Sequence, residues 1–309
     1  MQYMQVMIQA STKRPISLQI KLPILIAIIM QTVILGLSSS ETPLMDPSIN
    51  ARQLALARTY HSEPDFNNLH YNPSAIVNTN GISIYGINYQ AIDYSSILYT
   101  TNTNEWYYGI QYTGSSLSSV TRSYVENSTD ITEIDSTVQY EYHAFNVATA
   151  TTIYGINIGG GLTSKTIILD DTQISNIYAL YGCTIRLWNT INIGVANHHM
   201  PITIQNTSAF LVNQQISIGS ISYQPTEHTL FIMGLINNPN EYDFTTFHYS
   251  IEHFLNRHLA IRIGLDHNRI TSGIGLNLTP LTIDIGWGQS RDTIMEDQIV
   301  VSFSYDLAK

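Results

Sequence analysis

Hydrophobic and polar residues alternate along the last third of the chain. In residues 259–266, LAIRIGLD, the odd positions are large aliphatic residues and the even positions are small or charged. Residues 281–288, LTIDIGWG, and 299–307, IVVSFSYDL, repeat this pattern. Side chains of a β-strand point to opposite faces with period two, so each segment is predicted to be a strand with one apolar and one polar face. Glycines, serines and charges do not pack a core. We therefore expect the polar face to look into a wet lumen and the aliphatic face to contact lipid.

Similar segments continue upstream, and no convincing helix is found after Gly81. Most segments are close to the 9–11 residues with which a tilted strand crosses a bilayer. About 14 strands predict an all-β fold, a closed antiparallel transmembrane β-barrel over residues 81–309. Some early segments are expected to fuse. The expected strands are 81–91, 93–101, 105–114, 118–126, 136–147, 150–162, 176–188, 190–198, 212–224, 227–237, 243–254, 257–267, 270–279, 280–289 and 297–307.

The first forty residues have the order of an export signal. Lys13, Arg14 and Lys21 precede an apolar stretch over 22–37, and serines follow it. Charge, then an apolar run, then small residues predicts a signal peptide over residues 1–40. A retained membrane anchor is the alternative.

Residues 41–80 are predicted to be a plug or brace for the barrel. Their Ala- and Leu-rich stretch, 51–60, favours a helix, but one too short to be stable unless it docks on another element. An Asn-Pro turn follows within residues 70–76.

Charged residues are scarce. They make up 12% of the chain, about half of the usual ~25%, and polar uncharged residues and tyrosine take their place. Without the three basic residues of the predicted signal peptide, 10 Lys and Arg face 23 Asp and Glu, a net charge of about −13, which argues against a nucleic-acid partner. The 20 tyrosines fit an interfacial aromatic belt or simple β-propensity equally well. Cys183 is expected to be a small hydrophobe.

Four charged residues fall on the polar, lumen-facing side of the predicted strands. They are Arg186, Arg262, Asp266 and Asp284. The favoured interpretation is that Arg186, Arg262 and Asp284 pair across the lumen, since buried charges must be compensated. The alternative is that Arg186 or Arg262 captures the carboxylate of a ligand.

No motif for catalysis, phosphate binding or metal binding is found, so we expect a protein that is not an enzyme and uses no cofactor or metal. The late histidines do not converge: His198 and His199 are adjacent and should face opposite sides. The run Gly159–Gly161 is read as a kink that lets the barrel curve.

Residues 51–77 resemble the N-terminal segment of FadL-like outer-membrane proteins, especially the PorV/PorQ group. In that group an Ala-rich helical stretch precedes a Tyr-Asn-Pro-Ala turn. Here the turn is Tyr71-Asn72-Pro73-Ser74, with serine in place of alanine. The C-terminal third is also similar, in a Glu-bearing strand at 249–252 and in segments 259–264, 271–275, 283–284 and 301–305.

This resemblance implies a barrel of about 14 strands in the bacterial outer membrane, with the N-terminal segment inside or against it. FadL itself passes long-chain fatty acids across that membrane. PorV-type members work with type IX secretion and hold exported cargo at the cell surface. The expected partners are therefore outer-membrane lipid and either secreted protein cargo or a hydrophobic small molecule.

Three functions follow in order of preference. A secretion-associated scaffold predicts a plugged barrel with a polar lumen. A transporter of hydrophobic solutes predicts an apolar pocket near residues 51–77 with a side opening. A soluble secreted β-protein predicts aliphatic faces that pack against each other.

Overall fold

The computed structural model describes residues 49–89, 92–127, 130–169, 172–204, 216–237, 245–266, 269–290 and 297–307. The predicted signal peptide, residues 1–40, and the first part of the predicted plug segment, residues 41–48, lie outside these ranges.

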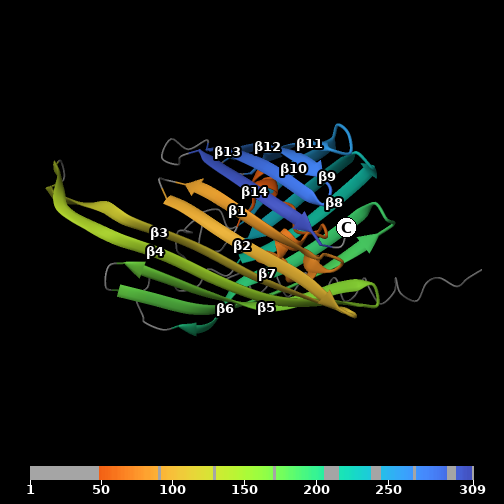
Figure 1. Ribbon diagram of the computed structural model, residues 1–309, viewed down its shortest axis with the longest axis horizontal. Coiled ribbons are helices and arrows are strands. Elements are labelled where there is room, and N and C mark those ends of the chain that lie inside the picture. The colour runs from red at the N-terminus through yellow and green to blue at the C-terminus, as the bar shows by residue number, and fades with distance from the viewer. Residues whose placement is uncertain are drawn as a thin grey trace, which may run out of the picture.

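The described strands close into a single antiparallel barrel (Figure 1). Each strand pairs with its neighbours in sequence, and β1 pairs with β14 to complete the ring. The prediction of an all-β, closed barrel of about 14 strands is confirmed. The strands are β1 (Gly81–Tyr89), β2 (Ile92–Thr103), β3 (Trp106–Asn127), β4 (Asp130–Ile153), β5 (Ile156–Leu169), β6 (Thr172–Leu187), β7 (Ile191–Ile204), β8 (Ile216–Thr226), β9 (Thr229–Asn237), β10 (Thr245–Phe254), β11 (Leu259–Leu265), β12 (Arg269–Leu278), β13 (Leu281–Ser290) and β14 (Gln298–Asp306).

Several strand ends are shifted by a few residues from the predicted ranges, and two predicted segments differ in kind. The segments 105–114 and 118–126 are one continuous strand, β3, because the polar residues between them are ordinary strand residues rather than a turn. The predicted strand 150–162 instead contains the turn between β4 and β5, where Tyr154 and Gly155 take positive φ angles of 51° and 75°. The alternation of apolar and polar residues continues through this turn, so the sequence pattern does not reveal the turn.

The two faces of the wall are as predicted. Ile261, Ile263 and Phe303 point outward with 39%, 62% and 49% of their surface exposed. Their neighbours Arg262 and Asp284 point inward and are buried. Apolar side chains therefore cover the outside of the barrel, and the aliphatic faces do not pack against each other as a soluble β-protein would require.

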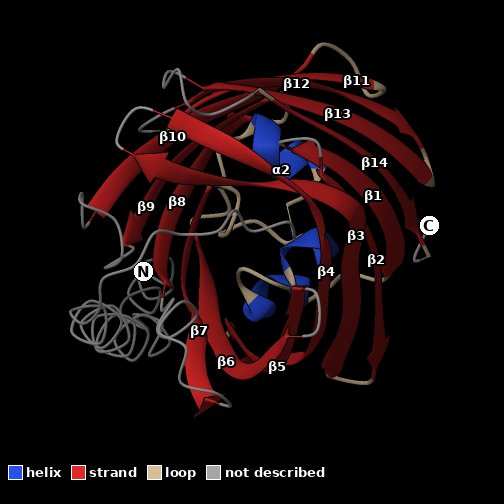
Figure 2. Ribbon diagram, turned by 90° about the vertical axis from the view of Figure 1, so that its left-hand side faces the viewer, coloured by secondary structure: helices blue, strands red, loops and turns tan. Residues whose placement is uncertain are grey.

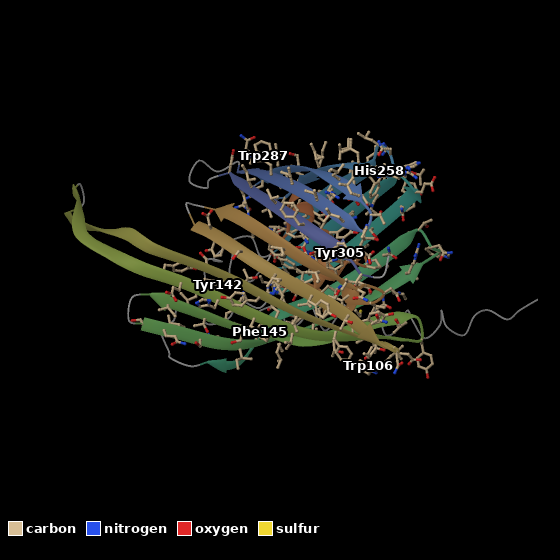
Figure 3. All side chains as sticks on the ribbon, viewed as in Figure 1. Trp106, Tyr142, Phe145, His258, Trp287 and Tyr305 are labelled. Atoms are coloured by element: carbon tan, nitrogen blue, oxygen red, sulfur yellow. The ribbon has the colours of Figure 1, made fainter. Side chains whose placement is uncertain are left out.

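Aromatic side chains occupy both ends of the outer face. Trp106 and Trp287 lie toward opposite ends of the barrel (Figure 3) and are 48% and 36% exposed. This is the arrangement of an interfacial aromatic belt. Not all tyrosines belong to this belt, because Tyr85, Tyr142 and Tyr178 are buried on the inner face.

The two ends of the barrel differ. At one end, at most four residues separate consecutive strands, as between Phe254 and Leu259. The first residue of β1, Gly81, pairs with Asp306 at this end, and the amide of Leu307 donates to the carbonyl of Asn80 at 2.8 Å. Outer-membrane barrels have their short turns at the periplasmic end, and we call this the short-turn end.

The segment 49–80, which we call the plug, lies inside the barrel (Figure 2). It contains α2 (Ala51–Ala55) and two 3-10 helices, η1 (Phe66–Asn68) and η2 (Pro73–Ile76). The helix expected over 51–60 is only half that length, because Ala57 and Arg58 adopt positive φ angles of 49° and 60°. No helix in the described part of the chain is long and apolar enough to span a membrane.

Candidate functional site

The plug backbone lies directly on the inner wall because glycines face it. A Cβ atom added at Gly159 would lie 2.5 Å from Pro73, and one added at Gly194 would lie 2.8 Å from Ser62. Real side chains do not fit at such distances, so only glycine allows this contact. Six inward glycines share the property; we call them the glycine track. They are Gly159, Gly182, Gly194, Gly264, Gly273 and Gly286.

The glycine track changes the interpretation of the small, polar inner face. The small and polar residues of this face predict a wet lumen, but where these glycines lie the plug fills the lumen. Gly159, read as part of a kink, is a contact point for the plug turn. The period-two pattern identified the inner face correctly and could not identify what fills it.

The plug turn Tyr71–Ser74 is held by one asparagine. The side-chain oxygen of Asn72 accepts hydrogen bonds from the Ser74 amide at 3.2 Å and the Ser74 hydroxyl at 2.7 Å. Its amide nitrogen donates to the carbonyl of His61 at 2.8 Å. Serine in place of the expected alanine thus adds a hydrogen bond, and Asn72 joins the two halves of the plug. All four turn residues are buried, with Tyr71 4% exposed.

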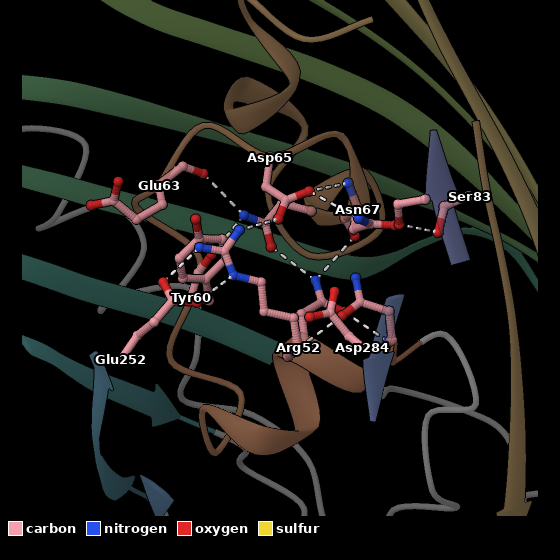
Figure 4. A network of polar contacts seen from close by, with 12 residues as sticks. Arg52, Tyr60, Glu63, Asp65, Asn67, Ser83, Glu252 and Asp284 are labelled. Carbon is pink, nitrogen blue, oxygen red and sulfur yellow. Dashed lines mark hydrogen bonds and ion pairs between the residues drawn. The ribbon is translucent and has the colours of Figure 1, made fainter. Parts of the chain in front are cut away.

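A chain of five ionised side chains ties α2 to the wall (Figure 4). Asp284 accepts from Arg262 at 2.6 Å, and Arg262 also donates to Glu252 at 2.7 Å. Glu252 then accepts from Arg52 of the plug at 2.6 Å, and Arg52 reaches Asp65 at 3.3 Å. Acids and guanidiniums alternate, so each buried charge has a partner of opposite sign. We call Arg52, Asp65, Glu252, Arg262 and Asp284 the ionic chain.

Another glycine makes room for the ionic chain on the wall. Arg262 on β11 and Asp284 on β13 are separated by β12. A Cβ atom added at Gly275 of β12 would lie 2.5 Å from both charged groups. The ion pair therefore crosses directly over Gly275.

Burial disfavours the charged form of Asp65, the plug's acidic member of the ionic chain. Burial raises the pKa of Asp65, and the Arg52 guanidinium opposes this by favouring the carboxylate. Arg52 also stacks over the ring of Tyr60, with 4.1 Å between the guanidinium carbon and the ring centre.

A cavity of about 510 Å³ opens beside the ionic chain at the short-turn end. Arg52, Asp65 and Asp284 of the ionic chain line it together with Phe254 and Asn277, which lie at strand ends. It is a vestibule between the plug and the short-turn end, with both polar and apolar groups in its lining.

Part of the inner face carries a buried cluster of aliphatic and tyrosine side chains, while other inward positions, such as Gln111 and Gln298, are polar. Tyr85 and Ile87 of β1 and Tyr94 of β2 are buried there together with residues of β4, β5, β8 and β14. The plug contributes to the same cluster. The remaining members of this apolar wall are Ile49, Ala51, Leu54, Tyr71, Tyr142, Ala144, Ile167, Ile218 and Val300.

Between these regions lies a buried cluster of imidazole rings. His61 and His70 of the plug both contact Tyr71, with ring centres 5.1 Å and 5.2 Å apart. His198 of β7 meets His70 at 5.8 Å. Burial lowers the pKa of His61 to about 3, so it is neutral at physiological pH. No group of His, Cys, Asp and Glu suited to a metal ion occurs within the described ranges.

The four charged residues singled out in the sequence do not form one site. Arg262 and Asp284 are in the ionic chain. Arg186 is exposed at the end of β6, where it donates to the carbonyl of Asn189 at 2.8 Å. Asp266 lies in the connection after β11, where its amide donates to the carbonyl of Arg269 at 3.0 Å.

Sequence reasoning missed Arg52, Asp65 and Glu252. Glu252 carried a usable signal, because it lies on an inward position of an alternating strand and pairs in register with Arg262. Arg52 lies in a short helix whose docked face no pattern reveals.

No family model matches this chain, and no curated protein matches it in sequence. Solved structures do match. The toluene transporter TodX of P. putida has a TM-score of 0.63 at 11% identity, over 85% of this chain and 99% of that one. The toluene transporter TbuX of Ralstonia pickettii has a TM-score of 0.59 at 10% identity, over 84% and 98%. A FadL homologue of Pseudomonas aeruginosa has a TM-score of 0.52 at 9% identity, over 87% and 100%.

At these identities the likeness shows the fold, which is that of the FadL-like outer-membrane β-barrels. The apolar outer face and the aromatic residues at its two ends agree with such a location. The finer assignment to the PorV/PorQ group stays a prediction.

Proposed function

We propose that this FadL-like barrel is an outer-membrane channel for small hydrophobic molecules. The observation that carries the proposal is the apolar wall, where tyrosine and aliphatic side chains from β1, β2, β4, β5, β8 and β14 face the barrel interior and pack with the plug. An inner face that conducted ions or sugars would be polar. Binding sites for small apolar molecules are lined in the way seen here, by aliphatic and aromatic groups with a few polar ones.

The matched structures support the same choice. TodX and TbuX are described as toluene transporters, and another matched structure, with a TM-score of 0.55 at 9% identity, is described as a monoaromatic hydrocarbon channel. The shared fold and the apolar wall together support a transport role for this chain. Between the earlier alternatives, we therefore favour the transporter of hydrophobic solutes over the secretion scaffold.

Two isoleucines of β1 provide a matched test. Ile87 belongs to the apolar wall, whereas Ile84 on the same strand points outward and is 52% exposed. Uptake of radiolabelled toluene and laurate is measured in cells that lack other FadL-like channels. We expect Ile87→Asn to reduce uptake severalfold and Ile84→Asn to leave uptake per folded barrel unchanged. Equal uptake in cells with and without the protein would refute the proposal.

The secretion scaffold is the second candidate. It is favoured by the extent of plug contact, since the glycine track and the ionic chain fasten the plug at both halves. Crosslinking in intact cells tests it. Recovery of an exported protein at the cell surface, together with no effect of Ile87→Asn on uptake, would replace the channel proposal with the scaffold.

A further inference from the structure

Two adjoining cavities form a groove on the outer face of the barrel, over the neighbouring strands β7 to β11 (Figure 1). One has a volume of about 380 Å³ and is lined from β7, β8, β9 and β10, and the other has about 460 Å³ and is lined from β8, β9, β10 and β11. Both are lined by Ile221 and Met233, which point outward and are 43% and 44% exposed. Among the described residues, none from the plug lines either cavity. The two cavities are therefore parts of one groove that faces away from the lumen, and we call it the outer groove.

A missing side chain opens the outer groove at Gly219 of β8. This glycine pairs in register with Val195 of β7 and Leu235 of β9, and it lines the groove together with them. A Cβ atom added at Gly219 would meet no described atom within 4 Å. The next outward positions of β8, Ile221 and Tyr223, carry large side chains that are 43% and 48% exposed. Gly219 therefore leaves a recess in a wall that is otherwise covered by large apolar groups.

One end of the outer groove is polar. Ser217, Asn237 and Thr245 form a row across β8, β9 and β10, because Asn237 pairs in register with both of the others. All three line the groove, and we call them the polar row. They lie at the strand ends opposite the short turns, which in outer-membrane barrels is the extracellular end. From this row toward Phe231 the outward lining is apolar, so the groove has the polarity of an amphiphile with its head at the extracellular side.

The size of the outer groove fits one acyl chain. From Asn237 to Phe231 it follows β9 for about 20 Å, at about 3.4 Å per residue. With a strand tilt of about 40° this is about 15 Å along the bilayer normal, a little over half of the ~25 Å apolar band and thus the depth of one leaflet. A transmembrane helix spans both leaflets and is about 10–12 Å wide, whereas the backbones of β7 and β9 on either side of Gly219 are only about 10 Å apart. A second copy related by a two-fold axis would set the recess against an identical recess and leave both unfilled.

The chemistry of the polar row selects the headgroup. None of the described residues that line the outer groove is charged. Phosphate is typically bound by arginine and lysine, so the phosphate of a phospholipid would find no cation there. The hydroxyl and amide groups of the polar row can donate to and accept from the hydroxyls and amides of an acylated sugar.

We propose that the outer groove binds one glycolipid of the outer leaflet, with an acyl chain along Gly219, Met233 and Phe231 and the sugar at the polar row. The groove is continuous with the lipid-facing wall, so hydrocarbon is the medium in contact with it. Burial of the chain supplies the affinity, and the polar row fixes its direction. The site lies on the opposite side of the wall from the plug and the apolar wall, so it serves a function in addition to solute passage.

The test uses the full-length barrel in mild detergent and native mass spectrometry, which counts the lipids bound to each barrel. Two probes are titrated separately. Lipid A is an acylated sugar, and dipalmitoylphosphatidylethanolamine offers acyl chains on a phosphate headgroup.

Three variants accompany the wild type. Gly219→Leu fills the recess, and Asn237→Leu with Thr245→Leu removes most of the polar row. The matched control is Gly160→Leu, which adds the same side chain at another outward position of the wall, on β5, where a Cβ atom would meet only the Leu180 carbonyl at 3.7 Å. A heat-dependent shift in gel mobility verifies that each variant is a folded barrel.

We expect the wild type and Gly160→Leu to bind one lipid A per barrel, at least tenfold more tightly than the phospholipid. Gly219→Leu should bind lipid A at least tenfold more weakly, and the polar-row variant should lose the preference between the two probes. Equal binding of lipid A to Gly219→Leu, or equal binding of both probes to the wild type, would overturn the proposal. A dimer that Gly219→Leu abolishes would also overturn it, in favour of a second copy.

Toluene uptake separates this proposal from the channel. Uptake by Gly219→Leu should equal that of the wild type, because the recess lies outside the lumen. A loss of uptake in this variant alone would indicate that the solute, and not a lipid, occupies the outer groove, and would overturn the proposal while supporting a channel. Absence of uptake in every protein would refute the channel and leave the lipid titration unaffected.

Discussion

Glu252 is the residue whose change should loosen the plug most cleanly. It is fully buried, and its two oxygens bind two guanidiniums, Arg52 of the plug and Arg262 of the wall. Glu252→Gln keeps the shape and removes the charge. Breaking a buried ion pair by removing one partner costs about 3–5 kcal/mol. Arg262 would keep Asp284 at 2.6 Å, and Arg52 would keep Asp65 while 23% of its side chain is exposed.

These remaining contacts put the expected cost near the lower limit, about 3 kcal/mol. Each 1.4 kcal/mol is a factor of ten in an equilibrium. The undocked population of α2 should therefore rise by about 100-fold. Hydrogen exchange of amides 51–55 in the folded barrel measures this directly, as a faster exchange rate by the same factor.

The control is Glu227→Gln, which changes an exposed acid paired with exposed His228 at a turn and should leave exchange at 51–55 unchanged. A double variant, Arg52→Gln with Glu252→Gln, removes the unpaired guanidinium as well and should recover part of the loss. If Glu252→Gln speeds exchange less than threefold, or if the two substitutions are simply additive, the ionic chain does not hold the plug.

Further predictions concern the wall, the imidazole cluster and the outer face. Gly159→Ala should destabilise the docked plug by about 1–3 kcal/mol, because the new Cβ meets Pro73. Gly219→Ala, where an added Cβ meets nothing within 4 Å, should be neutral; equal urea midpoints for both variants would contradict the contact. The pKa of His61 is about 3 when folded and 6.5 when unfolded, so its contribution is fully present above pH 6.5 and is lost as the pH falls toward 3. Wild type should lose roughly 2–3 kcal/mol more than His61→Leu between pH 7 and 4.5, and parallel pH curves would refute this; Asp65, whose pKa is raised, acts with the opposite sign in both proteins. Ile263→Lys on the outer face should cost roughly 2–4 kcal/mol in a bilayer and Ile263→Leu almost nothing, measured by urea unfolding in vesicles; no difference between the two would place Ile263 outside lipid.

Most features of the barrel wall could be predicted from the sequence, but few features of the barrel interior could be. Period two is enough to predict which face of a strand is apolar, so Ile261 and Arg262 were assigned to the correct sides. The same rule does not reveal a tight turn whose residues continue the alternation, as at Tyr154 and Gly155. Turn residues at such positions need positive φ angles, and a tyrosine gives no signal of that kind.

The site was harder to predict because its parts are far apart in the chain. Arg52 and Glu252 are separated by 200 residues, and no local pattern links a docked helix to one particular strand. Counting the register of β10 and β11 would have paired Glu252 with Arg262. The glycine track could not be predicted for a similar reason. Small inward residues leave space for either water or the plug backbone, and only the three-dimensional path of the plug shows which of the two fills that space.

The seam between β1 and β14 bears on how this molecule is assembled. The plug continues directly into β1 at Gly81, and α2 packs on β13 and β14 at the other side of the same seam. Because the plug is continuous with the first strand and packs against the last two, its docking also braces the place where the ring is closed.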